Sequence, residues 1–481
     1  SEYTKNYMKL PNRLEVVSFI SGFALLAFEL VAARVLAPTI GSSTYVWTSV
    51  IGVIIAALSL GYWVGGQVAD TRARATDIIG LLIVTAGTVL LTQLTYLGAL
   101  RWITEVAADP RLQAVIVSII LFAPTSFLLG ALGPYLAKLN VVSLKTSGSR
   151  VASLSALNSV GGIVGTFVTG FFLFGYVGSR ETFGIIIVLL VAISWVILPR
   201  YKPLHRAVVS VFLLAALFIP SPSLPGITDI DTPSSHYQVI DFLYKDQLVR
   251  GLTTGPSGVQ SAVYKDGGSD PVFWYAQEIS RLTVEKNPAD ILILGGGAFT
   301  LPQYLAEQLP RSQIDVVEID PELEQISTDY FNYNQPSNVQ PIFQDARSYI
   351  SQSSKKYDVI IVDVYGDTSI PFSLITKEYG RAIEDNVAPG GAVIVNIIAG
   401  LSGPCKEALG AVDAAYREKL PHAVYAREPG SSERRANFIV SYSRKPIHDT
   451  SRPELPRFKG EPYTDNFSPA ERLYYNCQTV Q

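Results

Sequence analysis

The chain has 481 residues, of which 48% are hydrophobic and only 16% are charged, and its mean hydropathy is +0.27. Ordinary soluble proteins carry about 25% charged residues, and this composition excludes a disordered chain, a collagen-like chain and a disulfide-rich scaffold. The net charge of −3 conceals two unlike halves, since 15 of the 38 basic residues but only 8 of the 41 acidic residues precede Pro222. The first half therefore carries +7 and has the composition of a membrane domain, whereas the second carries −10 and has that of a soluble one.

Seven apolar segments of the first half approach the length of about 20 residues that a helix needs to cross a bilayer. We expect membrane helices at residues 14–37, 47–68, 78–100, 113–137, 152–176, 182–199 and 206–220. The last is the shortest and runs into Pro220 and Pro222. The sequence thus predicts a transmembrane helical domain over residues 1–222.

Polar residues inside these segments are candidates for function. Glu29 and Arg34 fall in the first segment and Asn158 in the fifth. Intramembrane charges mark functional sites by default, so we treat these three as a candidate polar cluster. The structural alternative is an ion pair between Glu29 and Arg34, or an Arg34 side chain that reaches the membrane interface.

Four glycines of the fifth segment have the small-residue spacing with which helices approach closely in lipid. We expect them to serve helix packing. They are Gly161, Gly162, Gly165 and Gly170.

The basic residues of the short loops orient this bundle. Lys and Arg gather before the first segment and after the second, fourth and sixth, so we expect a cytoplasmic N-terminus in a cell membrane. Seven crossings would place the second half outside the cytoplasm, but a last segment that only enters the membrane would leave it inside. Cys405 and Cys477 bear on this choice, because they could pair in an oxidising compartment and would stay reduced in the cytosol.

The second half alternates short apolar runs with helical stretches. Residues 236–265 predict a small antiparallel sheet with a turn at 255–258. Buried parallel strands are expected at residues 289–294, 314–317, 339–343, 357–362 and 392–396. This alternation predicts a doubly wound, Rossmann-like sheet. We place a linker and small β-domain at residues 223–288 and a Rossmann-like nucleoside-binding catalytic domain at residues 289–481.

Candidate ligand-binding residues follow the carboxyl ends of these strands, where such sheets bind ligands. Three glycines, 295–297, come after the first strand, and Glu318 ends the second, where a carboxylate can accept bonds from ribose hydroxyls. Asp345 lies beyond the third strand, in reach of an adenine amino group, and Asp363 ends the fourth. Phe299 stands where a pyrophosphate motif needs a glycine. Any one of these acids could be an ordinary exposed carboxylate, but their order predicts a site for a nucleoside without phosphates.

Other classes of function lack their signatures. No phosphate-loop Lys follows the glycines, and no strand–Gly-x-Ser-x-Gly–helix context of a hydrolase is present. With 4 His and 2 Cys in the whole chain, we expect no metal cluster. The acidic balance and the lack of basic runs argue against a nucleic-acid partner.

The ordered motifs resemble the spermidine synthase (aminopropyltransferase) family, and in particular its membrane-fused bacterial and archaeal members. In the second half the resemblance rests on residues 237–238, 258–261, 295–297, 317–320, 344–347, 357–363 and 464–471. In the first half it rests on residues 28–34, 41–47 and 65–70.

This resemblance implies aminopropyl transfer from decarboxylated S-adenosylmethionine to a small amine, with methylthioadenosine as product, no metal, and a homodimer. Asp363 would orient and deprotonate the attacking amine. The implied donor-binding residues are Gln238, Gln260, Gly295, Gly296, Gly297, Glu318, Asp345 and Ala346. The implied amine-binding residues are Tyr237, Tyr275, Gln277, Tyr365 and Asp367.

Two departures from the family pattern leave the acceptor amine open. The loop 363–367 reads Asp-Val-Tyr-Gly-Asp instead of Asp-Ser-x-Asp-Pro, and the stretch 275–278 is one residue longer than the usual Tyr-His-Glu. One alternative is a methyltransferase or sulfonium-cleaving enzyme of the same fold that uses S-adenosylmethionine itself. Another is a polyamine or nucleoside transporter or sensor whose soluble domain is not catalytic. Since the donor is made in the cytosol, its supply favours a cytosolic second half, against the charge bias of the loops.

Overall fold

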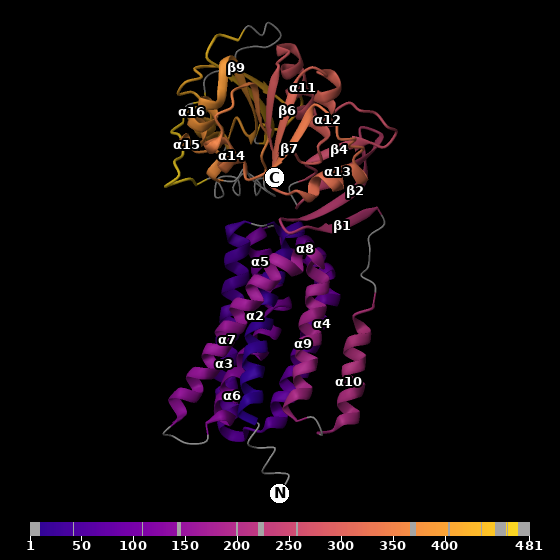
Figure 1. The fold of residues 1–481 in the computed structure, drawn as a ribbon, viewed down its shortest axis with the longest axis vertical. Coiled ribbons are helices and arrows are strands. Elements are labelled where there is room, and N and C mark those ends of the chain that lie inside the picture. The colour runs from indigo at the N-terminus through magenta and orange to yellow at the C-terminus, as the bar shows by residue number, and fades with distance from the viewer. Residues whose placement is uncertain are drawn as a thin grey trace. The chain divides into compact units, whose positions relative to one another are not determined.

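The computed structural model describes residues 10–41, 43–107, 109–141, 146–198, 201–219, 226–255, 258–365, 372–402, 405–433, 435–447, 458 and 460–469 (Figure 1). The chain divides into a helical unit, Ser1–Leu224 with Asp231–His236, and an α/β unit, Pro225–Ile230 with Tyr237–Gln481. The division after Leu224 lies close to the boundary expected at residue 222. The short stretch Asp231–His236 is part of the helical unit although the residues on either side of it belong to the α/β unit.

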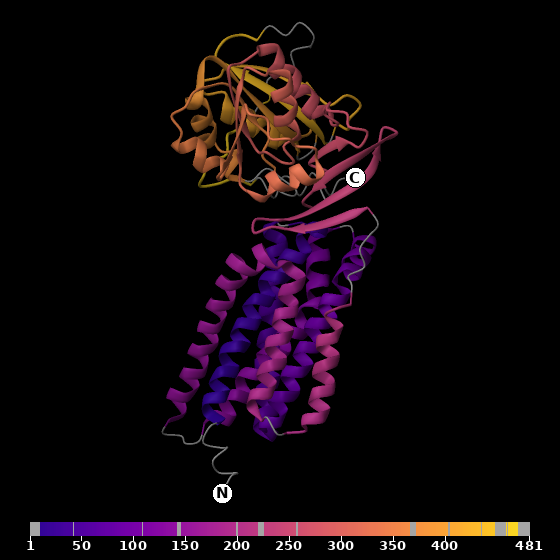
Figure 2. The ribbon, with the colours of Figure 1, turned by 45° about the vertical axis from the view of Figure 1, so that its right-hand side comes forward.

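The helical unit consists of apolar helices that run alongside one another, drawn from indigo to magenta in Figures 1 and 2. Val31, Leu82 and Ile187 are buried between helices, whereas Phe171 is among many large apolar side chains on the outside. Helices that are apolar on every side suit a lipid surrounding. The elements are α2 Leu10–Ile40, α3 Thr44–Arg72, α4 Ala75–Val106, α5 Pro110–Leu121, α6 Ala123–Asn140, α7 Ser147–Val168, the π-helical turn η2 Thr169–Leu173, α8 Phe174–Tyr176, α9 Gly178–Ile197 and α10 Pro203–Ala216.

Five of these helical runs are long and apolar enough to cross a membrane: α2, α3, α4, the run from α7 to α8, and α9. The predicted segment 113–137 is instead broken into α5 and α6, which meet at Phe122 with a bend of 52° and together make a sixth candidate span. The 14 residues of α10 reach only about 21 Å, less than the roughly 30 Å of a hydrocarbon core. The seven expected segments therefore correspond to five candidate spans, one broken pair of helices and one short helix.

Glycines bring α7 into backbone contact with α2. A Cβ added to Gly161 would lie 1.9 Å from the Phe19 carbonyl oxygen, and one added to Gly165 would lie 2.5 Å from that of Phe23. These distances confirm the predicted packing role of both glycines. The expectation was wrong for Gly170, whose added Cβ would meet no heavy atom of the described residues within 4 Å.

The α/β unit begins with a four-stranded sheet in the order β1-β2-β3-β4. Its strands are β1 Ile227–Asp231, β2 His236–Tyr244, β3 Gln247–Thr253 and β4 Ser261–Tyr264. The pairs β2–β3 and β3–β4 are antiparallel, as predicted for residues 236–265, and β1 is an additional strand. Residues 256 and 257 of the predicted turn lie outside the described residues.

A seven-stranded sheet in the order β10-β11-β9-β8-β5-β6-β7 forms the centre of the α/β unit. The strands are β5 Asp290–Leu294, β6 Gln313–Glu318, β7 Val339–Phe343, β8 Tyr357–Val362, β9 Val387–Ala399, β10 His422–Arg427 and β11 Ala436–Ser443. Strands β5 to β9 pair in parallel, which confirms the five predicted strands. Strands β10 and β11 were not predicted and extend one edge in antiparallel pairing.

Helices cover both faces of this sheet. They are α11 Trp274–Lys286, α12 Thr300–Gln308, α13 Glu322–Tyr330, α14 Ala346–Gln352, the short 3-10 turn η3 Phe372–Leu374, α15 Lys377–Asn386 and α16 Cys405–Tyr416. Alternate residues of β5 point to opposite faces. Ile291 and Ile293 share a core with α11, α12 and α13, whereas Leu292 and Leu294 share one with α14, α15 and α16. The predicted doubly wound sheet is therefore present, and the carboxyl ends of β5 to β8 lie at one edge.

Candidate active site

The turn that follows β5 runs close to two other segments of the α/β unit. Gly295 has φ +96° and Gly297 has φ +52°, values that favour glycine. A Cβ on Gly295 would lie 2.2 Å from the carbonyl oxygen of Asp363, and one on Gly297 would lie 2.7 Å from Ser261 Oγ. Ser261 Oγ also accepts a hydrogen bond from the Ala298 N–H at 3.2 Å. The glycine turn therefore connects the end of β8 with the small sheet.

The carboxylate of Glu318, at the end of β6, holds this turn in place. Its Oε2 accepts from the N–H groups of Gly296 at 2.9 Å and Gly297 at 3.2 Å. Its Oε1 accepts from those of Ile319 at 2.7 Å and Asp320 at 3.1 Å. Burial raises the pKa of Glu318, and the four N–H groups oppose that rise. Since a carboxylate has about four acceptor positions, a ribose would have to replace some of these N–H groups.

Asp345 and Ala346 lie beyond β7, at the start of α14. Asp345 is exposed, and its Oδ1 accepts from the Ser348 N–H at 2.8 Å, which caps the helix. The preceding residue, Gln344, donates its N–H to the Glu318 carbonyl oxygen at 3.0 Å. The segment expected to contact adenine is thus hydrogen-bonded to the segment expected to contact ribose.

Asp363 follows β8 and lies beside the glycine turn. Its N–H donates to the Leu294 carbonyl oxygen at 3.0 Å, and its Oδ1 accepts from Asn396 Nδ2 at 2.9 Å. Burial raises the pKa of Asp363 to about 6, although the bond from Asn396 opposes the rise. Such a carboxyl is ionised at neutral pH yet takes up a proton more readily than a free aspartate, as a general base must.

Asn396, three residues before the end of β9, was not singled out by the sequence. It is 4% exposed, and its Oδ1 has no hydrogen-bond partner among the described residues. The only signal in the sequence is that an amide interrupts the apolar run of β9. The structure therefore adds Asn396 to the candidate site.

Two tyrosines flank Asp363. The hydroxyl of Tyr275, in the first turn of α11, donates to the Gln260 carbonyl oxygen at 2.5 Å. Burial and then the charge of Asp363 raise the pKa of Tyr275 well above its usual value. The hydroxyl of Tyr365 donates to the Asn396 carbonyl oxygen at 3.0 Å and accepts from the Ile398 N–H at 2.7 Å. Four segments of the α/β unit thus meet around one carboxylate.

Several predicted residues have other partners. The side chain of Gln238 donates to Asp229 Oδ1 at 2.8 Å, that of Gln260 to Thr254 Oγ1 at 2.7 Å, and that of Gln277 to the Pro271 carbonyl oxygen at 2.8 Å. Tyr237 is 4% exposed and belongs to the core next to Val239. Asp367 lies outside the described residues. In the part of the chain that the structure describes, no group of three or more His, Cys, Asp and Glu side chains is arranged to hold a metal ion.

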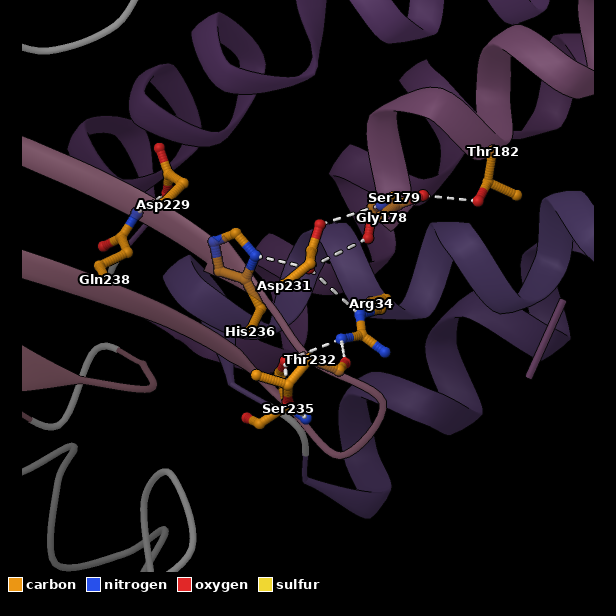
Figure 3. Close-up of polar contacts among 10 residues, drawn as sticks. All are labelled: Arg34, Gly178, Ser179, Thr182, Asp229, Asp231, Thr232, Ser235, His236 and Gln238. Carbon is orange, nitrogen blue, oxygen red and sulfur yellow. Dashed lines mark hydrogen bonds and ion pairs between the residues drawn. The ribbon is translucent and has the colours of Figure 1, made fainter. Parts of the chain in front are cut away.

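Two polar residues of the helical unit, Arg34 and Asn158, form hydrogen bonds with residues that are far away in the sequence. Arg34 Nε donates to Asp231 Oδ1 at 3.3 Å, 197 positions away, and its Nη2 donates to the carbonyl oxygens of Thr232 and Ser235 (Figure 3). Asn158 Nδ2 donates to the Ser18 carbonyl oxygen at 3.1 Å. Arg34 and Asn158 are thus held by different partners.

Asp231 is the centre of the contacts around Arg34. Its carboxylate also accepts from the Ser179 N–H, at the start of α9, and lies 2.9 Å from His236 Nδ1. Burial opposes ionisation of Asp231, but His236, Ser179 and Arg34 together lower its pKa to about 2. These contacts hold the turn between β1 and β2, residues 231–236, within the helical unit.

Comparison with known proteins assigns a family to part of the chain. Residues 274–397 match the spermine/spermidine synthase domain. The chain is 33% identical over 154 residues to a protein of Bifidobacterium longum described as a probable polyamine aminopropyl transferase, covering 32% of this chain and 34% of that one. It is 30% identical over 197 residues to the polyamine aminopropyltransferase of Vibrio vulnificus, covering 39% of this chain and 66% of that one.

Among solved structures, one similar chain is a probable spermidine synthase from Corynebacterium glutamicum. It is 24% identical, with a TM-score of 0.39, and the match covers 45% of this chain and 81% of that chain. Of the two curated relatives, the chain spans about one third of the length of the Bifidobacterium longum protein and about two thirds of the length of the Vibrio vulnificus protein.

Proposed function

The chain belongs, through its α/β unit, to the spermidine synthase-like family, and we propose that it transfers an aminopropyl group from decarboxylated S-adenosylmethionine to an amine. The observation that carries this proposal is the half-buried Asp363, with a pKa of about 6, between the glycine turn and Asn396. The expected products are methylthioadenosine and the aminopropylated amine.

The proposed reaction needs a base beside the nucleophile. The amine nitrogen attacks the aminopropyl carbon that is bonded to sulfur, the carbon–sulfur bond breaks, and its electron pair stays on sulfur as a neutral thioether. The amine must be neutral to attack, so Asp363 accepts its proton as the new carbon–nitrogen bond forms. The Oδ1 atom of Asn396 is a second acceptor at this place and would orient the amine N–H groups.

The glycine turn and Glu318 would bind the donor. The backbone of residues 295–297 allows close approach, and ribose hydroxyls would compete with the N–H groups of Gly296 and Gly297 for Glu318. Asp345 and Ala346 would contact the adenine. Binding of the donor therefore requires the turn to adjust, and protection of the 295–297 amides from hydrogen exchange should change when methylthioadenosine is added.

We also propose that the helical unit anchors the chain in a cell membrane with a cytoplasmic N-terminus. Five apolar helical runs of sufficient length support this location, and the basic loops support the orientation.

The direct test is the release of methylthioadenosine by the full chain in lipid nanodiscs. Decarboxylated S-adenosylmethionine is supplied with putrescine, cadaverine or spermidine, and methylthioadenosine is measured by mass spectrometry. We expect release with at least one amine, and a loss of about 100-fold or more in Asp363→Asn. Asp358→Asn is the matched control, because Asp358 lies at the start of β8 and accepts from the Ala289 N–H. Absence of release with every amine, or full activity of Asp363→Asn, would contradict the proposal.

A further inference from the structure

The last described part of the chain contains a short turn, and the stretch 464–471 that includes it carries part of the family resemblance. The N–H of Thr464 donates to the Phe467 carbonyl oxygen at 3.1 Å. The N–H of Phe467 in turn donates to the Thr464 carbonyl oxygen at 3.0 Å. Asp465 therefore lies at the tip of this turn, residues 464–467, which we call the C-terminal turn.

The C-terminal turn is attached to the start of α15. The N–H of Lys377 donates to the Tyr463 carbonyl oxygen at 2.8 Å. The N–H of Asp465 donates to Glu378 Oε2 at 3.1 Å. The hydroxyl of Thr376, which caps α15 and is fully buried, donates to Asp465 Oδ1 at 2.7 Å. Backbone and side-chain hydrogen bonds thus fix the turn on the α/β unit.

The other carboxylate oxygen of Asp465 binds Arg347, on α14. Arg347 Nη2 donates to Asp465 Oδ2 at 2.5 Å. Arg347 Nη1 donates to Thr376 Oγ1 at 2.9 Å and to the Ser373 carbonyl oxygen. A hydroxyl has one proton to donate, and an ionised carboxylate can only accept. Because Thr376 donates its proton to Asp465, its lone pairs stay available to Arg347, so Asp465 fixes the guanidinium both directly and through Thr376.

Arg347 connects two segments of the candidate active site. It directly follows Asp345 and Ala346, which we expect to contact the adenine. Its partner Ser373 belongs to η3, the next element after Asp363 among the described residues. Helices α14 and α15 share a core on one face of the sheet (Figure 1). A guanidinium with acceptors on η3, on the cap of α15 and on the C-terminal turn therefore restricts movement of the first turn of α14.

We propose that Asp465 is a positioning residue of the donor site, which acts through Arg347 to hold the segment 345–346 where the adenine binds. This inference rests on the proposed donor site. The ion pair is charge-assisted, and the side chain of Arg347 is only 23% exposed, so solvent screens it in part. Ala346 and Ile350 keep α14 in the core of the sheet face. Loss of the carboxylate charge should therefore loosen the first turn of α14 without unfolding the α/β unit.

The test measures the Kd of methylthioadenosine for the full chain in nanodiscs by isothermal titration calorimetry. We expect Asp465→Asn to raise this Kd by about tenfold. Asp465→Glu, which keeps the charge, should restore most of the affinity. Glu461→Gln is the matched control, because Glu461 is an exposed acid in the same part of the chain, and it should leave the Kd unchanged.

A double-mutant cycle separates positioning through Arg347 from a general effect on the fold. Arg347→Gln alone should raise the Kd at least as much as Asp465→Asn does. The two changes together should raise it no further than Arg347→Gln alone, because residues that act through one contact are not additive. An unchanged Kd in Asp465→Asn, or effects of the two changes that add, would overturn the inference.

The same titration distinguishes the role of Asp465 from the transfer reaction. A native chain that binds methylthioadenosine but releases none from decarboxylated S-adenosylmethionine would contradict the transfer reaction alone, and the cycle would still decide the role of Asp465. A native chain that does not bind methylthioadenosine would overturn the donor site and the role of Asp465 with it.

Discussion

The amide of Asn396 influences how readily Asp363 takes up a proton. Its N–H favours the ionised carboxylate, so Asn396→Ala should raise the pKa of Asp363 further above about 6. Activity needs the ionised form and is lost as pH falls through that pKa. The acidic limb of kcat/KM for methylthioadenosine release should therefore move to higher pH in Asn396→Ala. The control Asn437→Ala, on β11, should leave the limb in place, and an unchanged limb in Asn396→Ala would refute this role.

Single residues illustrate what the sequence could and could not predict about the site. The positions of Glu318 and Asp363 followed from strand ends, because parallel strands end at a common edge. The hydrogen-bond partners of these two carboxylates could not be predicted from the sequence. Glu318 is bonded by backbone N–H groups of its neighbours and of the glycine turn, which no pattern of side chains reveals. Arg34 bonds a residue 197 positions away, whereas the sequence suggested its near neighbour Glu29.

The glycine turn after β5 is an element whose shape the candidate site requires. In Gly295→Ala the new Cβ would meet the Asp363 carbonyl oxygen and displace that residue, and misplacement by about 1 Å can lower a rate about 100-fold. Gly430→Ala is a matched control, because Gly430 has φ +73° and open space around the added Cβ. This variant should lose only the stability, about 1–2 kcal/mol, that an alanine costs in the left-handed backbone conformation. Methylthioadenosine release should fall in the first variant alone, and equal losses would contradict this explanation.

The contact between α2 and α7 makes a second prediction about elements. Alanine in place of a helical glycine normally stabilises by about 1 kcal/mol, but Gly161→Ala would place its Cβ 1.9 Å from the Phe19 carbonyl oxygen and force the helices apart. Gly170→Ala, with open space in the same helical run, is the control. Thermal unfolding in detergent should begin at lower temperature in Gly161→Ala only. Two variants of equal stability would show that the contact is not tight.

Helices and strands were predicted correctly where their apolar pattern was continuous. Features that the apolar pattern does not encode, such as a bend in a helix, were missed. Strands β5 to β9 have buried apolar runs that length and flanking residues identify. The bend between α5 and α6 was missed, because hydropathy over 113–137 measures apolar length and not direction. Pro124, in the first turn of α6, was its only local sign.

For the whole molecule, Cys405 bears on the side of the proposed membrane that the α/β unit would face. Cys405 is buried and disulfide-bonded, and the other cysteine of the chain, Cys477, lies outside the described residues. Disulfides persist in oxidising compartments, which favours an α/β unit outside the cytoplasm, whereas a cytoplasmic N-terminus followed by six crossings, with α10 too short for a seventh, would leave the unit inside. Polyethylene glycol maleimide should label the denatured chain from cells only after reduction. Labelling without reduction would place the unit in the cytosol.

The central claim is that the α/β unit transfers an aminopropyl group. It is tested most directly by supplying the full chain in nanodiscs with deuterated decarboxylated S-adenosylmethionine, unlabelled S-adenosylmethionine and putrescine together. We predict deuterated aminopropylated putrescine and methylthioadenosine in equal amounts, with Asp363 required for both. Methylated putrescine with S-adenosylhomocysteine would contradict the claim and identify the chain as a methyltransferase.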